Sequence, residues 1–143
     1  MNLRHSLTLM VFAFGVTIFP SAALLADSAP DGKTLFHTHC SVCHGQEGTG
    51  EDPQWLNGGW REDGTRIAPA LNGTAHAWHH EPQLLYSYVK DGSIDTTSPM
   101  PSFGDQLTDE QIWSVIRYIQ SLWPEKIRKI YEERFPGGLG EQD

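Results

Sequence analysis

The segment HTHCSVCHG, residues 37–45, constrains this chain more than any other part of its sequence, because it holds both cysteines of the 143 residues. Cys40 and Cys43 lie three positions apart, and His44 follows the second cysteine directly. Four kinds of site use such a pair: a structural disulfide, a redox-active dithiol, part of a zinc site, or a covalent anchor for a cofactor. The compartment and the rest of the chain must decide among them.

The first 26 residues have the pattern of a secretory signal peptide. Arg4 gives a basic start, residues 7–19 form an uncharged apolar run, and small residues follow in PSAALLADSAP. This order predicts export to the periplasm, with cleavage after Ala26 or, as a second option, after Ala23. The alternative is an uncleaved anchor facing the periplasm, because residues 6–26 carry no charge and are about long enough to span a bilayer. The small residues favour cleavage.

The charge of the chain argues against two classes of partner. The formal net charge is −8, and removal of the leader takes away Arg4 and no acid, which makes it −9. Nucleic acid and anionic membrane surfaces are therefore not expected partners, unless a retained leader holds the protein at a membrane. The exported part is rich in glycine and proline and can form only a small core. A bulky apolar cofactor at its centre would supply the missing core.

Helix signals recur along the chain, and no run of alternating residues predicts a strand. Asp31 can cap a helix in GKTLFHTHC, Pro82 suits the first turn of EPQLLYSYVKDG, and Thr108 with Gln111 forms a capping box before an apolar stripe that reaches Leu122. The sequence predicts an all-α domain over 27–124, with three to five helices and long loops at 46–66 and 93–107. Residues 125–143 are expected to form a charged helix and a frayed tail.

Three of the four cysteine interpretations meet difficulties. A redox dithiol needs a strand–helix–strand unit, which the sequence does not predict. A structural zinc site needs four ligands, and a histidine directly after the second cysteine would strain tetrahedral closure. Five further histidines could offer the fourth ligand: His37, His39, His76, His79 and His80. A disulfide across so short a loop adds little stability. Cys-x-x-Cys-His is the attachment signal of a c-type haem, with Cys40 and Cys43 forming thioethers and His44 binding the iron.

A second axial ligand is expected at Met100. It is the only methionine outside the predicted leader, and it lies between Pro99 and Pro101. Both prolines restrict the backbone, which holds the thioether in a stiff, extended loop. The alternative is a methionine that fills a gap in the core. Given one haem and one methionine, we expect the ligand.

These segments resemble the class I monohaem cytochromes c of the bacterial periplasm. GKTLFHTHCSVCHG is similar to the first helix and haem motif of that family, and SPMPSFGDQLTDEQIWSVIRYIQSLWP is similar to its methionine loop and last helix. The resemblance covers residues 31–124. It implies the cytochrome c fold around one covalent haem, and a crosswise contact of the first and last helices at Gly32, Phe36 and Tyr118.

The resemblance also implies further contacts with the haem and its ligands. The carbonyl of Pro69 is expected to accept a hydrogen bond from the proximal imidazole, as metal-bound histidines generally require. Trp78 is the expected neighbour of a haem propionate, with Trp55 and Trp60 as competitors. The middle helix offers Tyr86 or Tyr88 as a neighbour of the methionine, although simple core packing explains them as well.

The expected function is one-electron transfer without catalysis, because an iron with two side-chain ligands has no open site for a substrate. The resemblance implies a carrier between a donor dehydrogenase or quinol-oxidising complex and a terminal oxidase or reductase. A dedicated electron-transfer subunit of such a complex is the alternative, with the 46–66 loop and the 125–143 segment as docking surfaces or solvated additions. A haem gas sensor or a peroxidase-like enzyme is a third possibility, and it requires Met100 to leave the iron easily.

Overall fold

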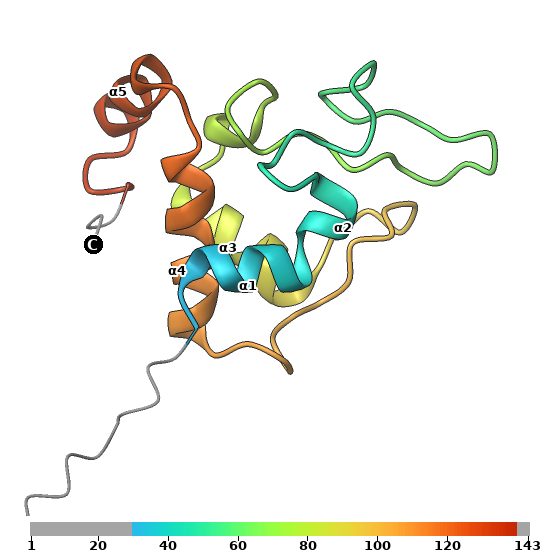
Figure 1. The fold of residues 1–143 in the computed structure, drawn as a ribbon, viewed down its shortest axis with the longest axis horizontal. Helices are drawn as coiled ribbons and strands as arrows, with labels where there is room; N and C mark the ends of the chain where they lie inside the picture. The colour runs from blue at the N-terminus through green and yellow to red at the C-terminus, as the bar shows by residue number, and fades with distance from the viewer. Residues whose placement is uncertain (1–29, 140–143) are drawn as a thin grey trace, which may run out of the picture.

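A computed structural model describes residues 30–139, and the structural statements below concern this part of the chain. The elements in order are α1 (Gly32–His39), α2 (Ser41–His44), the 3₁₀ helix η1 (Ala77–His79), α3 (Pro82–Asp91), α4 (Asp109–Ser121) and α5 (Glu125–Arg134). Between residues 30 and 139 the only β-structure is one isolated bridge, between Trp60 and Arg66. The predicted all-α fold is confirmed. The helices gather on one side, and the segment joining α2 to η1 reaches away from them (Figure 1).

Helices α1 and α4 begin at residues whose side chains satisfy free backbone N–H groups. The Asp31 carboxylate accepts a hydrogen bond from the Thr34 N–H at 2.7 Å and caps α1. Thr108 and Gln111 form the predicted capping box of α4, each accepting a hydrogen bond from the other's backbone N–H. Such caps involve residues three positions apart, which is why the sequence alone locates them.

The centre of the fold is the crossing of α1 over α4. Gly32 approaches the α4 backbone so closely that a Cβ atom there would lie 2.0 Å from the Ser114 carbonyl oxygen. Phe36 is fully buried, and its ring centroid lies 5.3 Å from that of Tyr118. The expected contact of Gly32, Phe36 and Tyr118 is confirmed. Burial of a side chain such as Phe36 stabilises the fold by about 1.5–3 kcal/mol.

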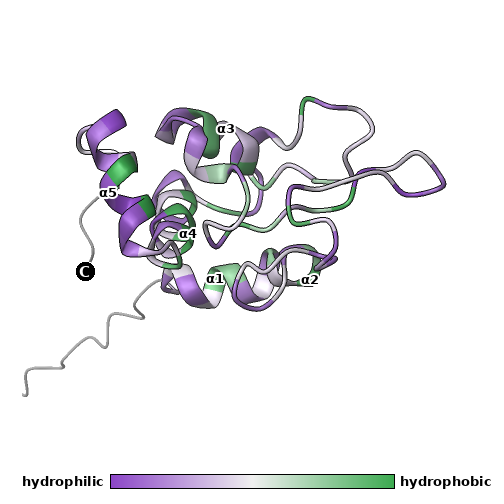
Figure 2. Ribbon diagram, turned by 90° about the horizontal axis from the view of Figure 1, so that it is seen from above, coloured by the Kyte–Doolittle hydropathy of each residue, from purple (hydrophilic) through white to green (hydrophobic). Residues whose placement is uncertain are grey.

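The last helix belongs to the core and is not a solvated addition. Helix α5 is hydrophilic along most of its length (Figure 2). Its Tyr131 is nevertheless fully buried, with its ring 4.9 Å from that of Trp123 in an edge-to-face arrangement. After α5, the carbonyl of Gly138 accepts a hydrogen bond at 2.8 Å from the side chain of Gln120, a buried residue of α4. Residues 136–139, part of the expected tail, form turns in which the Gly137 N–H also donates to the Glu132 carboxylate at 2.7 Å.

No helix between residues 30 and 139 is both long and apolar enough to cross a membrane. The predicted leader, residues 1–26, and its cleavage site lie outside the described residues.

Candidate cofactor site

Two consecutive short helices bring the cysteine motif into one turn of the chain. Cys40 ends α1, donating its backbone N–H to the Phe36 carbonyl, and it also begins α2. The His44 N–H returns to the Cys40 carbonyl at 2.9 Å. Because the motif spans this single turn, Cys40, Cys43 and His44 all face one cavity.

The cavity has a volume of about 460 Å³, within the range of pockets that bind cofactors. Its lining includes Cys40, Cys43, His44, Pro69 and Met100. Much of its wall is apolar, built from residues of the loops and of α3 and α4: Ile67, Leu71, Leu85, Val89, Phe103, Ile116 and Ile119. The fold thus collects two thiols, an imidazole and a thioether around a largely apolar space, which is the donor set that a covalent haem requires.

The His44 imidazole is oriented by a backbone carbonyl. Its Nδ1 lies 2.8 Å from the Pro69 oxygen. A carbonyl oxygen can only accept, so Nδ1 must carry the proton and Nε2 keeps its lone pair. Burial lowers the pKa of His44, and the hydrogen bond to Pro69 offsets this only in part. The ring is therefore neutral at neutral pH and can bind a metal through Nε2.

The two cysteines are not joined in a disulfide. Burial, and secondarily the neighbouring Cys43, raise the pKa of Cys40 to about 11, so Cys40 is a thiol at neutral pH. Within residues 30–139, no three side chains among His, Cys, Asp and Glu are grouped so that they could hold a metal ion. A zinc site would need such a group, and the histidines outside the motif do not provide it.

The loop that carries Met100 is tied to the end of α3. The Ser93 N–H lies 3.3 Å from the Met100 carbonyl oxygen. Gly92 has φ +80°, and a Cβ there would lie 2.9 Å from the Pro101 carbonyl carbon. Only glycine combines this left-handed conformation with such a close backbone approach. The flanking prolines could be recognised in the sequence, whereas the role of this glycine could not.

Of the aromatic residues expected near the haem and Met100, only one lines the cavity. Trp78 is not among the residues that line the cavity; it packs on the hydrophobic core, with its ring 3.8 Å from that of His79. Trp55 and Trp60 are exposed. Of the two tyrosines, Tyr88 lines the cavity; the other belongs to the α3–α4 contact, where it stacks on Trp113.

The cavity wall has a polar part that was not expected from the sequence. His76 and His80 both line the cavity, and their rings lie 5.5 Å apart. Asn57 and Arg66 also contribute to the lining. The four-residue spacing of the two histidines was the only local signal, since both flank the 3₁₀ helix in a region without periodicity. Their neighbours Asn57 and Arg66 reach the site from a loop whose path no sequence pattern describes.

Comparisons with known proteins agree with the geometry. The sequence model of the cytochrome c family matches residues 29–123. The Cbb3-type cytochrome c oxidase subunit FixP of Bradyrhizobium diazoefficiens is 32% identical over 117 residues, which is 77% of this chain and 36% of the relative. The thiosulfate dehydrogenase of Psychrobacter arcticus is 27% identical over 119 residues, 83% of this chain and 33% of the relative.

A solved structure is also similar. One chain of the reducing HAO-like protein complex of Kuenenia stuttgartiensis aligns with a TM-score of 0.49 and 27% identity, over 65% of this chain and 42% of the other. This chain spans about a third of the length of the curated relatives above. The family match covers well over half of the chain, and the cavity collects Cys40, Cys43, His44 and Met100, the residues expected from the sequence to hold a haem. The chain belongs to the cytochrome c family, the electron-transfer proteins with a covalently bound c-type haem.

Proposed function

We propose that the protein is a periplasmic one-electron carrier whose haem is held by Cys40 and Cys43 and ligated by His44 and Met100. One observation carries the proposal: all four side chains line the same cavity, and the imidazole is already fixed with Nε2 as its free nitrogen. When bound, the haem supplies a one-electron redox couple.

The chain's own residues would set the properties of that couple. The thioether of Met100 is a soft ligand that favours the reduced iron, and a largely apolar wall that excludes water acts in the same direction. If His44 and Met100 both bind the iron, no coordination site would be left for a substrate. This favours electron transfer over catalysis.

The polar part of the cavity suits the two propionate carboxylates of a haem. Arg66, His76 and His80 are cationic or can donate hydrogen bonds. We assign the propionates to this wall. Trp78, which does not line the cavity, is the less well supported candidate.

The surface near the cysteines suits brief contact with a redox protein. Val42, between the two cysteines, is 84% exposed, and Ile94, at the cavity lining, is 87% exposed. Such small apolar contacts are typical of transient electron-transfer encounters. The net charge of −8 favours a partner with a basic rim around its contact site. Donor dehydrogenases, quinol-oxidising complexes, oxidases and reductases are the proposed classes of partner.

A dedicated subunit of one such complex is the second candidate. It is favoured by relatives that are named as an oxidase subunit and a thiosulfate dehydrogenase, and of which this chain spans about a third. Purification from the native periplasm or membrane separates the two functions. A free carrier elutes alone, whereas a dedicated subunit elutes in fixed ratio with its partner.

The proposed ligation is tested by Met100→Ala in the holoprotein, with His80→Ala as the matched change on another cavity-lining residue. The loss of Met100 should remove the weak red-end charge-transfer band, lower the midpoint potential and allow carbon monoxide to bind. His80→Ala should keep the band. If instead His80→Ala removed one axial ligand while Met100→Ala changed nothing, the His–Met assignment would be wrong. If the wild-type protein bound carbon monoxide readily, a gas sensor or peroxidase-like enzyme would replace the carrier.

Covalent attachment is tested separately, by extraction of the denatured protein with acidified organic solvent. The haem should stay with the protein. Its release into the solvent would contradict thioether formation at Cys40 and Cys43.

A further inference from the structure

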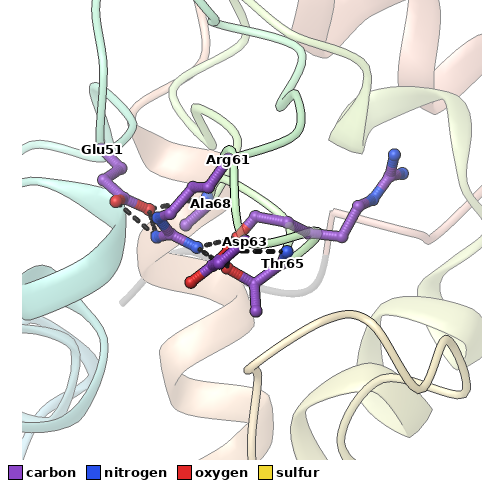
Figure 3. Close-up of polar contacts among 6 residues, drawn as sticks. Glu51, Arg61, Asp63, Thr65 and Ala68 are labelled. Atoms are coloured by element: carbon purple, nitrogen blue, oxygen red, sulfur yellow. Dashed lines mark hydrogen bonds and ion pairs between the residues drawn. The ribbon is translucent and has the colours of Figure 1, made fainter.

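The long loop between α2 and η1 contains an ion pair between Glu51 and Arg61, which is hydrogen-bonded to the chain segment that contacts His44. Both carboxylate oxygens of Glu51 accept hydrogen bonds from Arg61 Nη2, and one of them also accepts from the Ala68 N–H at 3.0 Å (Figure 3). The backbone N–H of Glu51 donates to the Ala68 carbonyl at 3.1 Å. Glu51 thus binds both the N–H and the carbonyl of Ala68, the residue directly before Pro69.

Arg61 is itself held at both ends of its guanidinium. Its Nη1 donates to the Thr65 hydroxyl at 3.0 Å and to the Arg66 carbonyl oxygen. The side chains of Glu51 and Arg61 are 33% and 34% exposed, so the pair is shielded from water over about two thirds of its surface. A forked guanidinium that contacts a carboxylate and a second chain segment has little freedom to move.

These contacts close a ring that begins and ends at His44. The Gly50 N–H donates to the His44 backbone carbonyl at 2.8 Å. Glu51 follows Gly50 in the chain and is hydrogen-bonded to Ala68. Pro69 follows Ala68, and its carbonyl accepts a hydrogen bond from the His44 Nδ1–H at 2.8 Å. The two ends of the histidine are therefore connected through one short path.

We propose that the Glu51–Arg61 pair is a positioning device that fixes the Pro69 carbonyl against the His44 imidazole and thereby sets the midpoint potential. The inference rests on the proposed role of His44 as the axial ligand. A firmly held acceptor on Nδ1 raises the basicity of the ligand and favours the oxidised iron. A loosened carbonyl gives a weaker hydrogen bond, so the midpoint potential should rise.

Two variants separate positioning from the effect of a nearby charge. Glu51→Gln keeps the shape of the side chain and removes its charge, while Arg61→Lys keeps the charge and removes the fork. If the pair acted only through its charges, Glu51→Gln would raise the potential and Arg61→Lys would leave it unchanged. Positioning predicts that both variants raise it. Glu62→Gln is the matched control, because it removes the charge of an exposed acid on the same loop.

The decisive readout is the exchange of the His44 Nδ1 proton with solvent, followed by NMR in the reduced holoprotein. In both variants exchange should be severalfold faster, up to about tenfold, the range expected when a neutral hydrogen bond worth about 1 kcal/mol is weakened or lost. Glu62→Gln should leave exchange unchanged. Unchanged exchange in both Glu51→Gln and Arg61→Lys would overturn the inference, as would an unchanged potential in Arg61→Lys.

The same samples distinguish this inference from the proposed function. If the wild-type protein lacks the red-end band of methionine ligation or loses haem to solvent extraction, the proposed function fails. If the wild-type protein passes both tests and the variants behave like Glu62→Gln, only the positioning role fails. If Glu51→Gln gives no folded holoprotein, Arg61→Lys decides the question alone.

Discussion

Replacing Gly32 by alanine should separate the two helices on which the haem site depends. The added Cβ would lie 2.0 Å from the Ser114 carbonyl oxygen, whereas ordinary contact begins at 3.4 Å, so α1 must move by roughly 1.4 Å. The atom in the way is a backbone oxygen inside α4, and it cannot rotate aside. Overpacking of this kind costs about 1–3 kcal/mol. Because the backbone must shift, we expect a cost near the upper end of this range. The better helix propensity of alanine reduces this cost by about 1 kcal/mol.

The net loss of about 2 kcal/mol should lower the melting temperature by about 8 °C, at about 4 °C per kcal/mol for a domain of this size. Thermal unfolding of the holoprotein, followed by circular dichroism, measures it. Lys33→Ala is the control, since it places the same side chain at the next, exposed position of α1. A Gly32→Ala melting temperature equal to that of Lys33→Ala would refute the tight crossing of α1 and α4.

Two substitutions and one measurement test other parts of the chain. The hydrogen bond from the Tyr86 hydroxyl at 2.6 Å is the main cause that lowers the pKa of Asp109 from 3.8, so this carboxylate stabilises the fold above that pH. Asp109→Asn should be slightly less stable than wild type at pH 7, and the difference should vanish as the pH falls below 3.8 in denaturant titrations. Gln120→Met should leave the Gly138 carbonyl without its donor, cost about 1–3 kcal/mol and speed carboxypeptidase digestion of the C-terminal segment. Mass spectrometry of the exported protein should find a new N-terminus after Ala26, and a retained Met1 would favour the anchored alternative.

The elements that could be predicted are those whose stabilising contacts lie within one turn of the chain. Asp31 caps α1 by accepting a hydrogen bond from the N–H three residues later, and Thr108 and Gln111 cap α4. The cysteine motif presents its thiols and its imidazole from a single turn. Each pattern has one local solution, so the sequence suffices to locate it. The resemblance to a known family added the helix crossing and the Pro69 carbonyl, which no local pattern would give.

The remaining features depend on contacts between residues far apart in the chain. His76 and His80, considered in the sequence only as possible zinc ligands, both line the cavity, and Trp78, expected beside a haem propionate, does not line it. No sequence pattern marks Gln120 on α4, yet it is buried and donates a hydrogen bond to the Gly138 carbonyl. In each case the position and burial of the side chain depend on how a loop packs against a helix that is distant in the sequence.

By itself, the sequence predicted the chemistry of the site: two thiols to attach a haem, an imidazole directly after them, and one methionine outside the predicted leader. Only the tertiary structure decided which contacts hold these side chains in place. Glu51 and Arg61 lie ten residues apart in a loop without periodicity, and their contact with Ala68 exists only once the loop has folded back. The physical reason is that a loop contact depends on the closure of the whole chain around the core, whereas a cap or a Cys-x-x-Cys-His turn is stabilised by its immediate neighbours.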